Sequence, residues 1–493
     1  MNTKQTIKTL FPIPQMLFSS LVLWIGVIFS GHSQQSEQAI LLSNVQVVKV
    51  ESGEILPNSA ILIEKGLIRA IGPKAELAKL SQNKLEVDGQ GKYLIPGLWD
   101  MHVHLEGADL VEDNEALLPV FLAYGITTVR DCASDLGLQV LKWREEINQG
   151  TRLGPTIYTA GRKLEGKNSL WKGDLEISNE EELHAMLDTL ERDRVDFVKI
   201  TENTLNGELF LKSVQAAHDR GFRVSGHVPM NLTISELLDA GYTSVEHASY
   251  LLRLGGEEDR IMKELRAGKI SNQEADQQLN ATFDQTRAIE KYRNLGSRGL
   301  FVCPTLIGSQ QLAYLQETDH SQDEFLDYLS ERFVRNYQWR IDRMANETPA
   351  QLQQRKDRLE LLKQQLPLMQ EAGIRLMAGS DAAALNTYVY PAESLLQELE
   401  IFQEAGLSPL QILQSTTLAG AEYFGVTDQQ GSISPGKKAD LVLLEENPLE
   451  RIQALRAVNS VLVRGRFYDR SQLDLMLENA RQTKLKLDRE RSH

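Results

Sequence analysis

The chain has 493 residues, a formal net charge of −15 and an apolar fraction of 42%, which is the composition of an ordinary globular protein. No basic stripe is interleaved with aromatic residues, so nucleic-acid binding is not indicated. The acidic residues are spread along the chain, which favours a role in solubility over a charged partner. The length exceeds one average domain, but α/β barrels with insertions reach it.

The N-terminus has the pattern of a secretory signal peptide over residues 1–33. Lys4 and Lys8 form its positive region, residues 16–30 form an apolar run, and small residues follow at 31–33. The run is shorter than the roughly 20 residues of a spanning helix, and no later run is long enough to span. We therefore expect export to the periplasm or the exterior, with an uncleaved anchor as the alternative.

Residues 35–93 alternate and turn like a small β unit, and residues 430–468 return to the same character. We predict that the two segments pair into one discontinuous β-sandwich domain built from both chain ends. The pattern of residues 469–493 predicts a polar helix with a thin apolar stripe. This helix is either packed on the predicted barrel or frayed.

Residues 94–429 alternate between short β runs and helical patterns. After an opening strand that leads to His104, the β runs are 125–133, 155–161, 195–200, 222–228, 243–249, 300–306 and 374–382. Alternation of this kind indicates parallel strands, and eight units predict a (β/α)8 TIM barrel. An open doubly wound sheet is the alternative, but it would need a glycine-rich phosphate turn that the sequence lacks.

Two long, charged, helical stretches exceed what a minimal barrel needs. They cover residues 257–295 and 317–370 and flank the seventh predicted strand. We interpret them as insertions that cap the barrel mouth, with solvated helical hairpins as the alternative. The two cysteines, Cys132 and Cys303, have no metal-ribbon or redox spacing and are expected to be buried free thiols.

The opening strand carries His102 and His104 with one residue between them. Side chains alternate across a strand, so residues two apart point the same way. Two imidazoles on one face form half of a metal site, since imidazole suits zinc, iron, nickel and copper. The alternative is two unrelated polar residues at a strand exit.

Further candidate ligands end other predicted strands, where barrels place their catalytic groups. They are Lys199 in the fourth strand, His227 in the fifth, His247 in the sixth and Asp381 in the eighth. Each one alone is more often structural, but together they would meet at one barrel mouth. Three weaker candidates for substrate binding near that mouth are Arg130, Tyr250 and Tyr390; Arg130 can alternatively form a structural ion pair.

Lys199 ends an apolar strand, where desolvation favours the neutral amine. A neutral amine can add carbon dioxide and become a carbamate, an anionic ligand with two oxygens that can bridge two metals. Without metal, a buried lysine at this position has no evident purpose.

The sequence resembles the amidohydrolase superfamily through LIPGLWDMHVHL, the Lys199 strand, SGHVP, VEHAS, AGSDA and GSISPGKKADLVLLEENPL. It is most similar to the imidazolonepropionase-like and Xaa-Pro dipeptidase-like branch. The resemblance implies a (β/α)8 barrel beside a β-sandwich and two divalent metals, usually zinc. It also implies that His102, His104 and Asp381 bind the more buried metal, that His227 and His247 bind the second, and that carboxylated Lys199 bridges them.

These residues lead us to expect hydrolysis of a C–N amide bond in a small peptide or N-acyl amino acid. The expected nucleophile is a hydroxide held between two metals, with Asp381 as the proton acceptor and donor. A single-metal cyclic amide hydrolase or deaminase and a catalytically silent secreted binding protein are the alternatives. The segment after Lys199, ITENTLNGE, lacks the glycine-rich loop of dipeptidase-like members, which leaves the identity of the substrate open. The oligomeric state is also open, and a homo-oligomer is one alternative.

Overall fold

The computed structural model describes residues 38–205 and 207–490. The predicted signal segment, residues 1–33, lies outside the described residues. Within the described ranges no helix combines the length and the apolar character needed to cross a bilayer. Cys132 and Cys303 are buried free thiols, as predicted.

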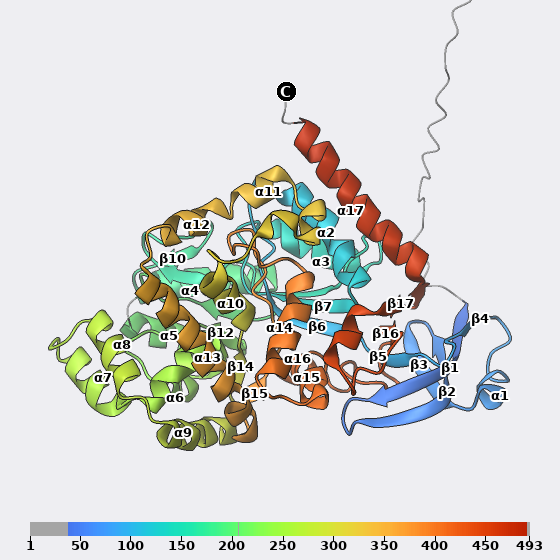
Figure 1. The fold of residues 1–493 in the computed structure, drawn as a ribbon, viewed down its shortest axis with the longest axis horizontal. Coiled ribbons are helices and arrows are strands. Elements are labelled where there is room, and N and C mark those ends of the chain that lie inside the picture. Colours follow the sequence, from blue (N-terminus) through green and yellow to red (C-terminus); the bar gives the residue numbers. More distant parts are fainter. Residues whose placement is uncertain (1–37, 206, 491–493) are drawn as a thin grey trace, which may run out of the picture. The chain divides into compact units, whose positions relative to one another are not determined.

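One sheet joins strands from both ends of the chain, in the order β18-β17-β16-β5-β1-β2-β3, with β4 beside β1. In Figure 1 its blue N-terminal strands lie next to the red C-terminal ones. Alternating apolar residues such as Ile61 and Ile63 form its core, as a pleated, half-buried surface requires. The strands are β1 (Ala39–Lys49), β2 (Glu54–Glu64), β3 (Leu67–Gly72), β4 (Lys84–Asp88), β5 (Tyr93–Pro96), β16 (Leu441–Leu444), β17 (Val458–Val463) and β18 (Arg466–Tyr468).

The boundary between this sheet and the rest falls later than the sequence suggested. β5 pairs with β1 and β16, whereas β6 (Leu98–Val103) pairs with β7 in a separate sheet. Gly97 lies between them, where an added Cβ would meet Thr127 Oγ1 at 2.0 Å. The run from Tyr93 onward is therefore two strands, since the chain must cross close to β7 at this glycine.

The remaining strands pair in parallel. They form a three-stranded sheet, β6-β7-β8, and a seven-stranded sheet, β10-β9-β11-β12-β13-β14-β15. All eight β runs predicted between residues 94 and 382 are present, in shorter form, whereas β9 and β10 were not predicted. Besides β6, the strands are β7 (Ile126–Asp131), β8 (Thr156–Thr159), β9 (Leu164–Gly166), β10 (Leu175–Ile177), β11 (Val198–Ile200), β12 (Val224–Gly226), β13 (Tyr242–Glu246), β14 (Phe301–Cys303) and β15 (Arg375–Leu376).

Backbone hydrogen bonds also run between the two parallel sheets on both sides. Asp196 N donates to Thr159 O at 2.9 Å, and Met101 N donates to Ala378 O at 2.9 Å. A parallel bridge between Val103 and Ala382 follows the second contact. The carboxyl ends of β6 and of the segment after β15 therefore lie side by side.

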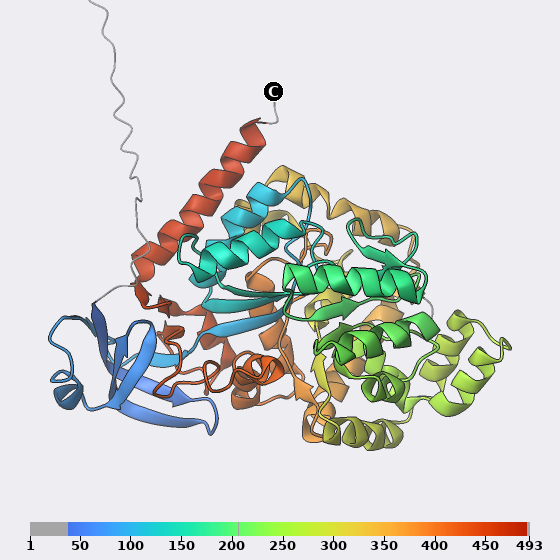
Figure 2. The ribbon, with the colours of Figure 1, turned by 180° about the vertical axis from the view of Figure 1, so that it is seen from behind.

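Helices lie around the parallel strands in both views (Figures 1 and 2). Several begin with capping residues; Thr348 and Gln351, for example, form a capping box at the start of α13. The helices are α1 (Lys74–Leu77), α2 (Val111–Ala123), α3 (Leu138–Asn148), α4 (Glu180–Asp193), α5 (Gly207–Asp219), α6 (Ile234–Asp239), α7 (Glu258–Arg266), α8 (Asn272–Ala281), α9 (Gln285–Ser297), α10 (Leu306–Tyr314), α11 (Glu331–Arg335), α12 (Gln338–Met344), α13 (Pro349–Glu371), α14 (Glu393–Glu404), α15 (Pro409–Ser415), α16 (Leu418–Phe424) and α17 (Arg470–Glu490).

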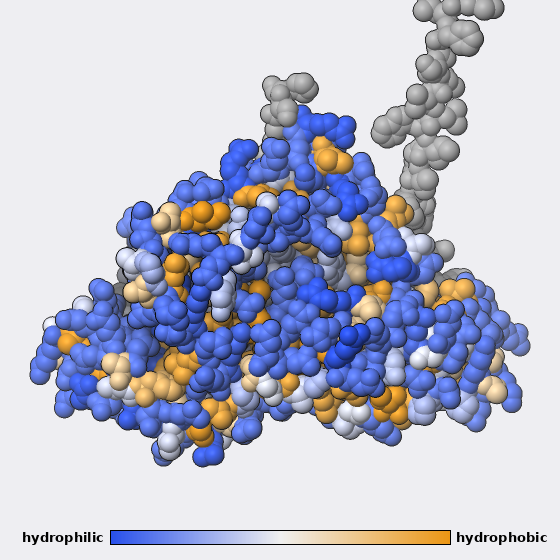
Figure 3. Space-filling view, viewed as in Figure 1, coloured by the Kyte–Doolittle hydropathy of each residue, from blue (hydrophilic) through white to orange (hydrophobic). Residues whose placement is uncertain are grey.

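The two charged stretches are helical, with α7 to α9 in the first and α11 to α13 in the second. Helix α17 packs against α2, and its stripe of Leu473, Met476, Ala480 and Leu487 is buried. Polar side chains cover most of the face seen in Figure 3, and apolar ones lie there in small separate groups.

Candidate metal centre

Three candidate ligands meet where β6 ends beside the segment after β15. The Nε2 atoms of His102 and His104 lie 3.3 and 3.2 Å from Asp381 Oδ1. One ligand atom from each of the three residues lies within 4.8 Å of the others. His102 is fully buried, whereas the side chain of Asp381 is 17% exposed. The group is therefore enclosed on one side and open to a cavity on the other.

Asp100 and Gly379 hold the two segments together. Asp100 accepts hydrogen bonds from Ser380 N and Oγ at 2.9 and 2.6 Å and from His102 N at 3.2 Å. Burial raises the pKa of Asp100 to about 7. A Cβ on Gly379 would lie 2.7 Å from His102 N, so the glycine permits the close approach that brings Asp381 to the histidines.

The other two predicted histidines lie beside this group. His227 follows β12 and His247 follows β13, and their ring centroids are 5.0 Å apart. The ring of His247 lies 5.2 Å from that of His102. His247 and Asp381 have φ angles of 71° and 58°, backbone conformations that non-glycine residues adopt rarely and that cluster at functional sites.

Each of the four histidines has its Nδ1 atom engaged by the protein, which leaves Nε2 for another contact. A fixed Nδ1 partner sets the tautomer and orientation of a metal-ligating imidazole. The pairs are His102 with Glu246 at 2.9 Å, His104 with Ala133 O at 2.8 Å, His227 with Glu202 at 2.8 Å and His247 with Thr305 Oγ1 at 2.7 Å.

Lys199 lies on β11 and is only 1% exposed. Its Nζ, like His102 Nε2, is buried without a hydrogen-bond partner among the described residues. Buried polar atoms without partners are costly and call for an explanation. Burial also lowers the pKa of His102 to about 4, so its imidazole is neutral, as a metal ligand must be.

This donor set fits divalent cations that take nitrogen and oxygen ligands, such as zinc. A second group, His102, Cys132 and Glu246, also has its ligand atoms close together. It fits a metal less well, because burial raises the pKa of the Cys132 thiol to about 12 and Glu246 is already paired. The residues that would hold metal are therefore His102, His104, Asp381, His227, His247 and, if carboxylated, Lys199.

The structure does not place Arg130 at the mouth of the site, which corrects the prediction of a substrate contact. Its guanidinium is fully buried, lies 2.6 Å from Glu246 Oε2 and donates to Met101 O at 2.6 Å. Glu246 in turn holds His102 Nδ1. The alternative prediction for Arg130, a structural ion pair, is confirmed. Its partner is Glu246 and not the adjacent Asp131.

A cavity of about 440 Å³ opens above the candidate ligands. The second insertion forms part of its wall through Trp339 and Arg340 on α12. The first insertion, residues 257–295, contributes no lining residue. Among the lining residues are His104, Lys199, His227, His247, Asp381, Glu106, Lys163, Leu170, Trp171, Trp339, Arg340 and Asn386.

The two predicted tyrosines have different surroundings. Tyr250 contacts the site: its ring centroid is 5.6 Å from that of His227 and its hydroxyl donates to Glu202 Oε1 at 2.6 Å. Tyr390 is buried, donates to Asp323 at 2.7 Å and stacks on Phe325. It does not line the cavity, so its predicted substrate contact is wrong. It packs instead against Phe325 and Tyr337 of the second insertion.

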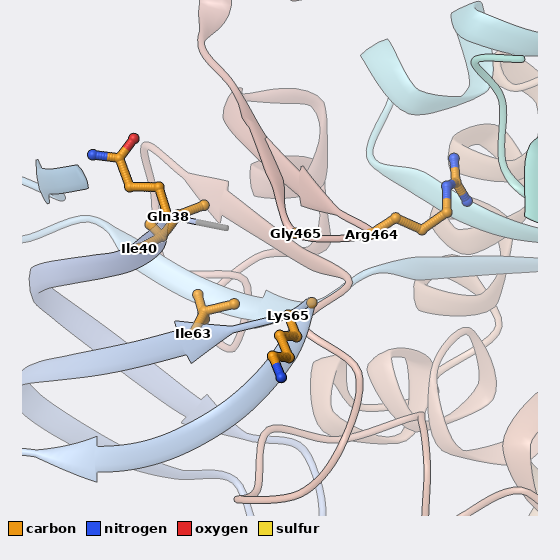
Figure 4. A pocket seen from close by; sticks show the side chains of 7 residues that line it. Gln38, Ile40, Ile63, Lys65, Arg464 and Gly465 are labelled. Atoms are coloured by element: carbon orange, nitrogen blue, oxygen red, sulfur yellow. The ribbon is translucent and has the colours of Figure 1, made fainter. Parts of the chain in front are cut away.

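Another hollow lies at the edge of the first sheet (Figure 4). It has no volume for a water molecule. The guanidinium of Arg464 points away from Lys65 and donates to Gly154 O, so the charged groups do not converge. This hollow is not a candidate site.

Sequence reasoning missed Glu202, which lies in the segment ITEN directly after Lys199. Burial alone would raise its pKa, but His227 and Tyr250 hold it at about 2, so it is an anion beside His227. Glu165 fixes this loop by accepting hydrogen bonds from Asn203 N, Thr204 N and Leu205 N. The loop without glycines therefore has a purpose: it delivers a carboxylate to a candidate ligand. The position of Glu202, three residues after the strand-end Lys199, was the sequence signal that could have predicted its place at the site.

The parallel sheets and the ligand-type residues at their carboxyl ends define an α/β protein with a candidate metal centre. The sequence profile of the amidohydrolase family matches residues 93–467. Because this is more than half of the chain, the protein belongs to the amidohydrolase family, as its motifs predicted.

Individual relatives are more distant. Adenine deaminase of Staphylothermus marinus is 29% identical over 233 residues, which are 43% of this chain and 36% of that protein. The match thus spans about a third of that relative's length.

Solved structures share the fold. The structure of bottromycin amidohydrolase has a TM-score of 0.67 at 20% identity over 90% of both chains. A Xaa-Pro dipeptidase with bound methionine has a TM-score of 0.61 at 20% identity, over 88% of this chain and all of that one.

Proposed function

We propose that the protein is a metal-dependent hydrolase that cleaves the C–N amide bond of a small peptide or an N-acyl amino acid. One observation carries the proposal: the buried nitrogen atoms His102 Nε2 and Lys199 Nζ have no hydrogen-bond partner among the described residues. Lys199 lines the same cavity as Asp381, and His102 Nε2 lies 3.3 Å from Asp381 Oδ1. Membership of the amidohydrolase family supports it. The fold likeness to a Xaa-Pro dipeptidase motivates the choice of small peptides.

Divalent cations held by these residues would supply the Lewis acidity that activates water and polarises a carbonyl. The protein's own part in the chemistry falls mainly to Asp381. Its carboxylate is exposed to the cavity and is kept ionised, because the neighbouring histidines lower its pKa more than burial raises it. It can accept the proton of the attacking water and deliver it to the leaving nitrogen.

The supporting residues keep this arrangement rigid. Glu202 and Glu246 orient His227 and His102 through their Nδ1 atoms. Tyr250 donates to Glu202 and packs on His227, which fixes both side chains. A site whose groups are already oriented loses little free energy to reorganisation during the reaction.

We further propose that the two parallel sheets close into a (β/α)8 barrel, with the sheet from both chain ends forming a β-sandwich beside it. Amidohydrolase structures support this expectation. The proposed cofactors are two Zn²⁺ ions with a carbamate on Lys199, and the proposed location is outside the cytoplasm, on the basis of the signal-like N-terminus.

The second candidate is a cyclic amide hydrolase or deaminase with one metal per chain. The sequence likeness to an adenine deaminase favours it. A single bound metal, an unmodified Lys199 and ammonia release from a heterocyclic amine would establish it in place of the first proposal.

The experiment is to load the full chain with zinc and to measure the number of metal ions per chain. The mass of peptides that contain Lys199 is determined under conditions that preserve a carbamate. The loaded enzyme is then assayed with a panel of dipeptides and N-acyl amino acids. We expect two metals and hydrolysis of part of the panel. Asp381→Ala is expected to keep most of the metal and to lose turnover by at least about a hundredfold. An inert panel with full metal content, or full activity in Asp381→Ala, would overturn the proposal.

A further inference from the structure

Arg340 is a cation in the cavity wall that has no carboxylate partner among the described residues. It lies on α12, in the second insertion, and is half-buried. Its hydrogen bonds go to neutral oxygens, Leu385 O and Asn386 Oδ1. The arginines that are buried among the described residues are ion-paired: Arg130 with Glu246, Arg253 with Glu258 and Arg332 with Asp113. The charges of Asp381 and Glu106 act on Arg340, but neither carboxylate forms an ion pair with it. A partly desolvated cation without a direct partner is costly, and an anionic ligand would supply one.

Arg340 is close to the candidate metal centre. Asn386 donates through Nδ2 to the backbone oxygen of Asp381 at 2.6 Å and accepts from Arg340 through Oδ1. One side chain thus links the guanidinium to the segment that carries Asp381. Arg340 also lines both the 440 Å³ cavity and an adjoining one of about 220 Å³ that reaches His247 and Asp381.

Apart from Lys199, which belongs to the candidate ligand set, the other lysine side chains of the cavity are less suited to bind an anion. Lys163 is paired with Asp174 at 3.0 Å and lies over the ring of Trp171. Lys172 is exposed at the rim. A guanidinium matches a carboxylate with two parallel hydrogen bonds, which an ammonium group cannot do.

Apolar side chains lie next to Arg340 at the rim. Trp171 and Trp339 meet edge to face at 5.6 Å, and Leu170 is 69% exposed. Leu170 and Trp171 come from the segment between β9 and β10, whereas Trp339 precedes Arg340 on α12. A substrate whose carboxylate reaches Arg340 would thus place an apolar group against these rings.

We propose that Arg340 binds the free carboxylate of the substrate, so that the enzyme selects amides of an amino acid whose α-carboxylate is free and whose neighbouring group is apolar. This inference rests on the proposed amide hydrolysis and identifies Arg340 as the specificity-determining residue. Arg340 therefore takes the role that the sequence suggested for Arg130, whose guanidinium is buried in an ion pair with Glu246.

The test compares each hydrolysed substrate as the free carboxylate and as the carboxamide, using the zinc-loaded full chain. We expect kcat/KM to be about 10- to 100-fold higher for the carboxylate, the effect of one charge-assisted bidentate contact. In Arg340→Gln this ratio is expected to fall to near 1, mainly through KM of the carboxylate. Arg335→Gln, a change of an exposed arginine on α11 in the same insertion, is the matched control and should keep the wild-type ratio.

A second measurement needs no variant. The free amino acid product and its carboxamide are compared as competitive inhibitors of the wild-type enzyme, and the carboxylate is expected to bind at least about tenfold more tightly. Equal hydrolysis of carboxylate and carboxamide together with equal inhibition would overturn the role of Arg340 while leaving the proposed function intact. An enzyme that hydrolyses no amide would instead refute the proposed function.

Discussion

The buried pair of Arg130 and Glu246 gives the sharpest test of how the candidate site is supported. Both side chains are fully buried and their charged atoms are 2.6 Å apart. Replacing Arg130 by Met would leave a carboxylate in the protein interior with no cation beside it. Breaking such a pair from one side costs about 3–5 kcal/mol. We expect Arg130→Met to lose that much free energy of unfolding.

The measurement is urea denaturation of chelator-treated protein, so that metal binding does not contribute to stability. The double variant Arg130→Met/Glu246→Leu removes both charges and should recover part of the loss, because it leaves no uncompensated charge in the interior. The recovery is partial because His102 Nδ1 and Ser244 Oγ lose their contact with Glu246. The coupling between the two positions is then expected to be several kcal/mol.

The reasoning would be refuted by a single variant as stable as the wild type, or by single and double variants that lose free energy additively. An increase in KM for carboxylate substrates without loss of stability would return Arg130 to the substrate site. Arg130→Lys is a useful control, since it keeps the charge but not the planar geometry.

Three further predictions concern other acidic residues. Burial raises the pKa of Glu398 from 4.5 to about 8, so the folded protein holds this proton more tightly than the unfolded chain does. The free energy of unfolding should therefore fall by about 1.4 kcal/mol per pH unit between pH 4.5 and 8 and then level off. Glu398→Gln should have a flatter profile in urea titrations at pH 6 and 8, and parallel profiles would contradict this. Glu202→Gln should weaken metal binding about 10- to 100-fold by releasing His227, as measured with a competing chelator; unchanged affinity would exclude the orienting role. Glu165→Ala should make the loop after β11 more accessible to proteolysis and hydrogen exchange than in the wild type, since several backbone N–H groups lose their acceptor; wild-type protection would show that the loop holds its shape without this carboxylate.

The sequence was sufficient to predict the parallel strands and the ligand-type residues at their ends because both depend on local pattern. Apolar β runs that end in His102, His227 or His247 have the spacing of strands, and parallel strands bring their carboxyl ends to one edge. The positions of Lys199 and Asp381 follow from the same rule. The family motifs added the expected ligand order.

What the sequence could not predict depends on partners far away in the chain. Whether Arg130 faces a cavity or an ion pair is decided by Glu246, more than a hundred residues later. β9 and β10 are three residues each, too short for a periodic signal. Tyr390 follows the last predicted strand, but its orientation is set by Asp323 in the insertion.

The proposed metal binding and the proposed substrate recognition fall on different parts of the chain. Candidate ligands come from strand ends that close backbone contacts hold in place, as Gly379 does beside His102. Arg340 and Trp339 instead come from α12 in an insertion that the barrel pattern does not require. A change on α12 should therefore alter substrate choice without altering metal content, whereas a change beneath the strand ends should alter metal content first. Because function resides in sites placed on a shared fold, relatives with similar ligands and a different insertion are expected to act on different amides.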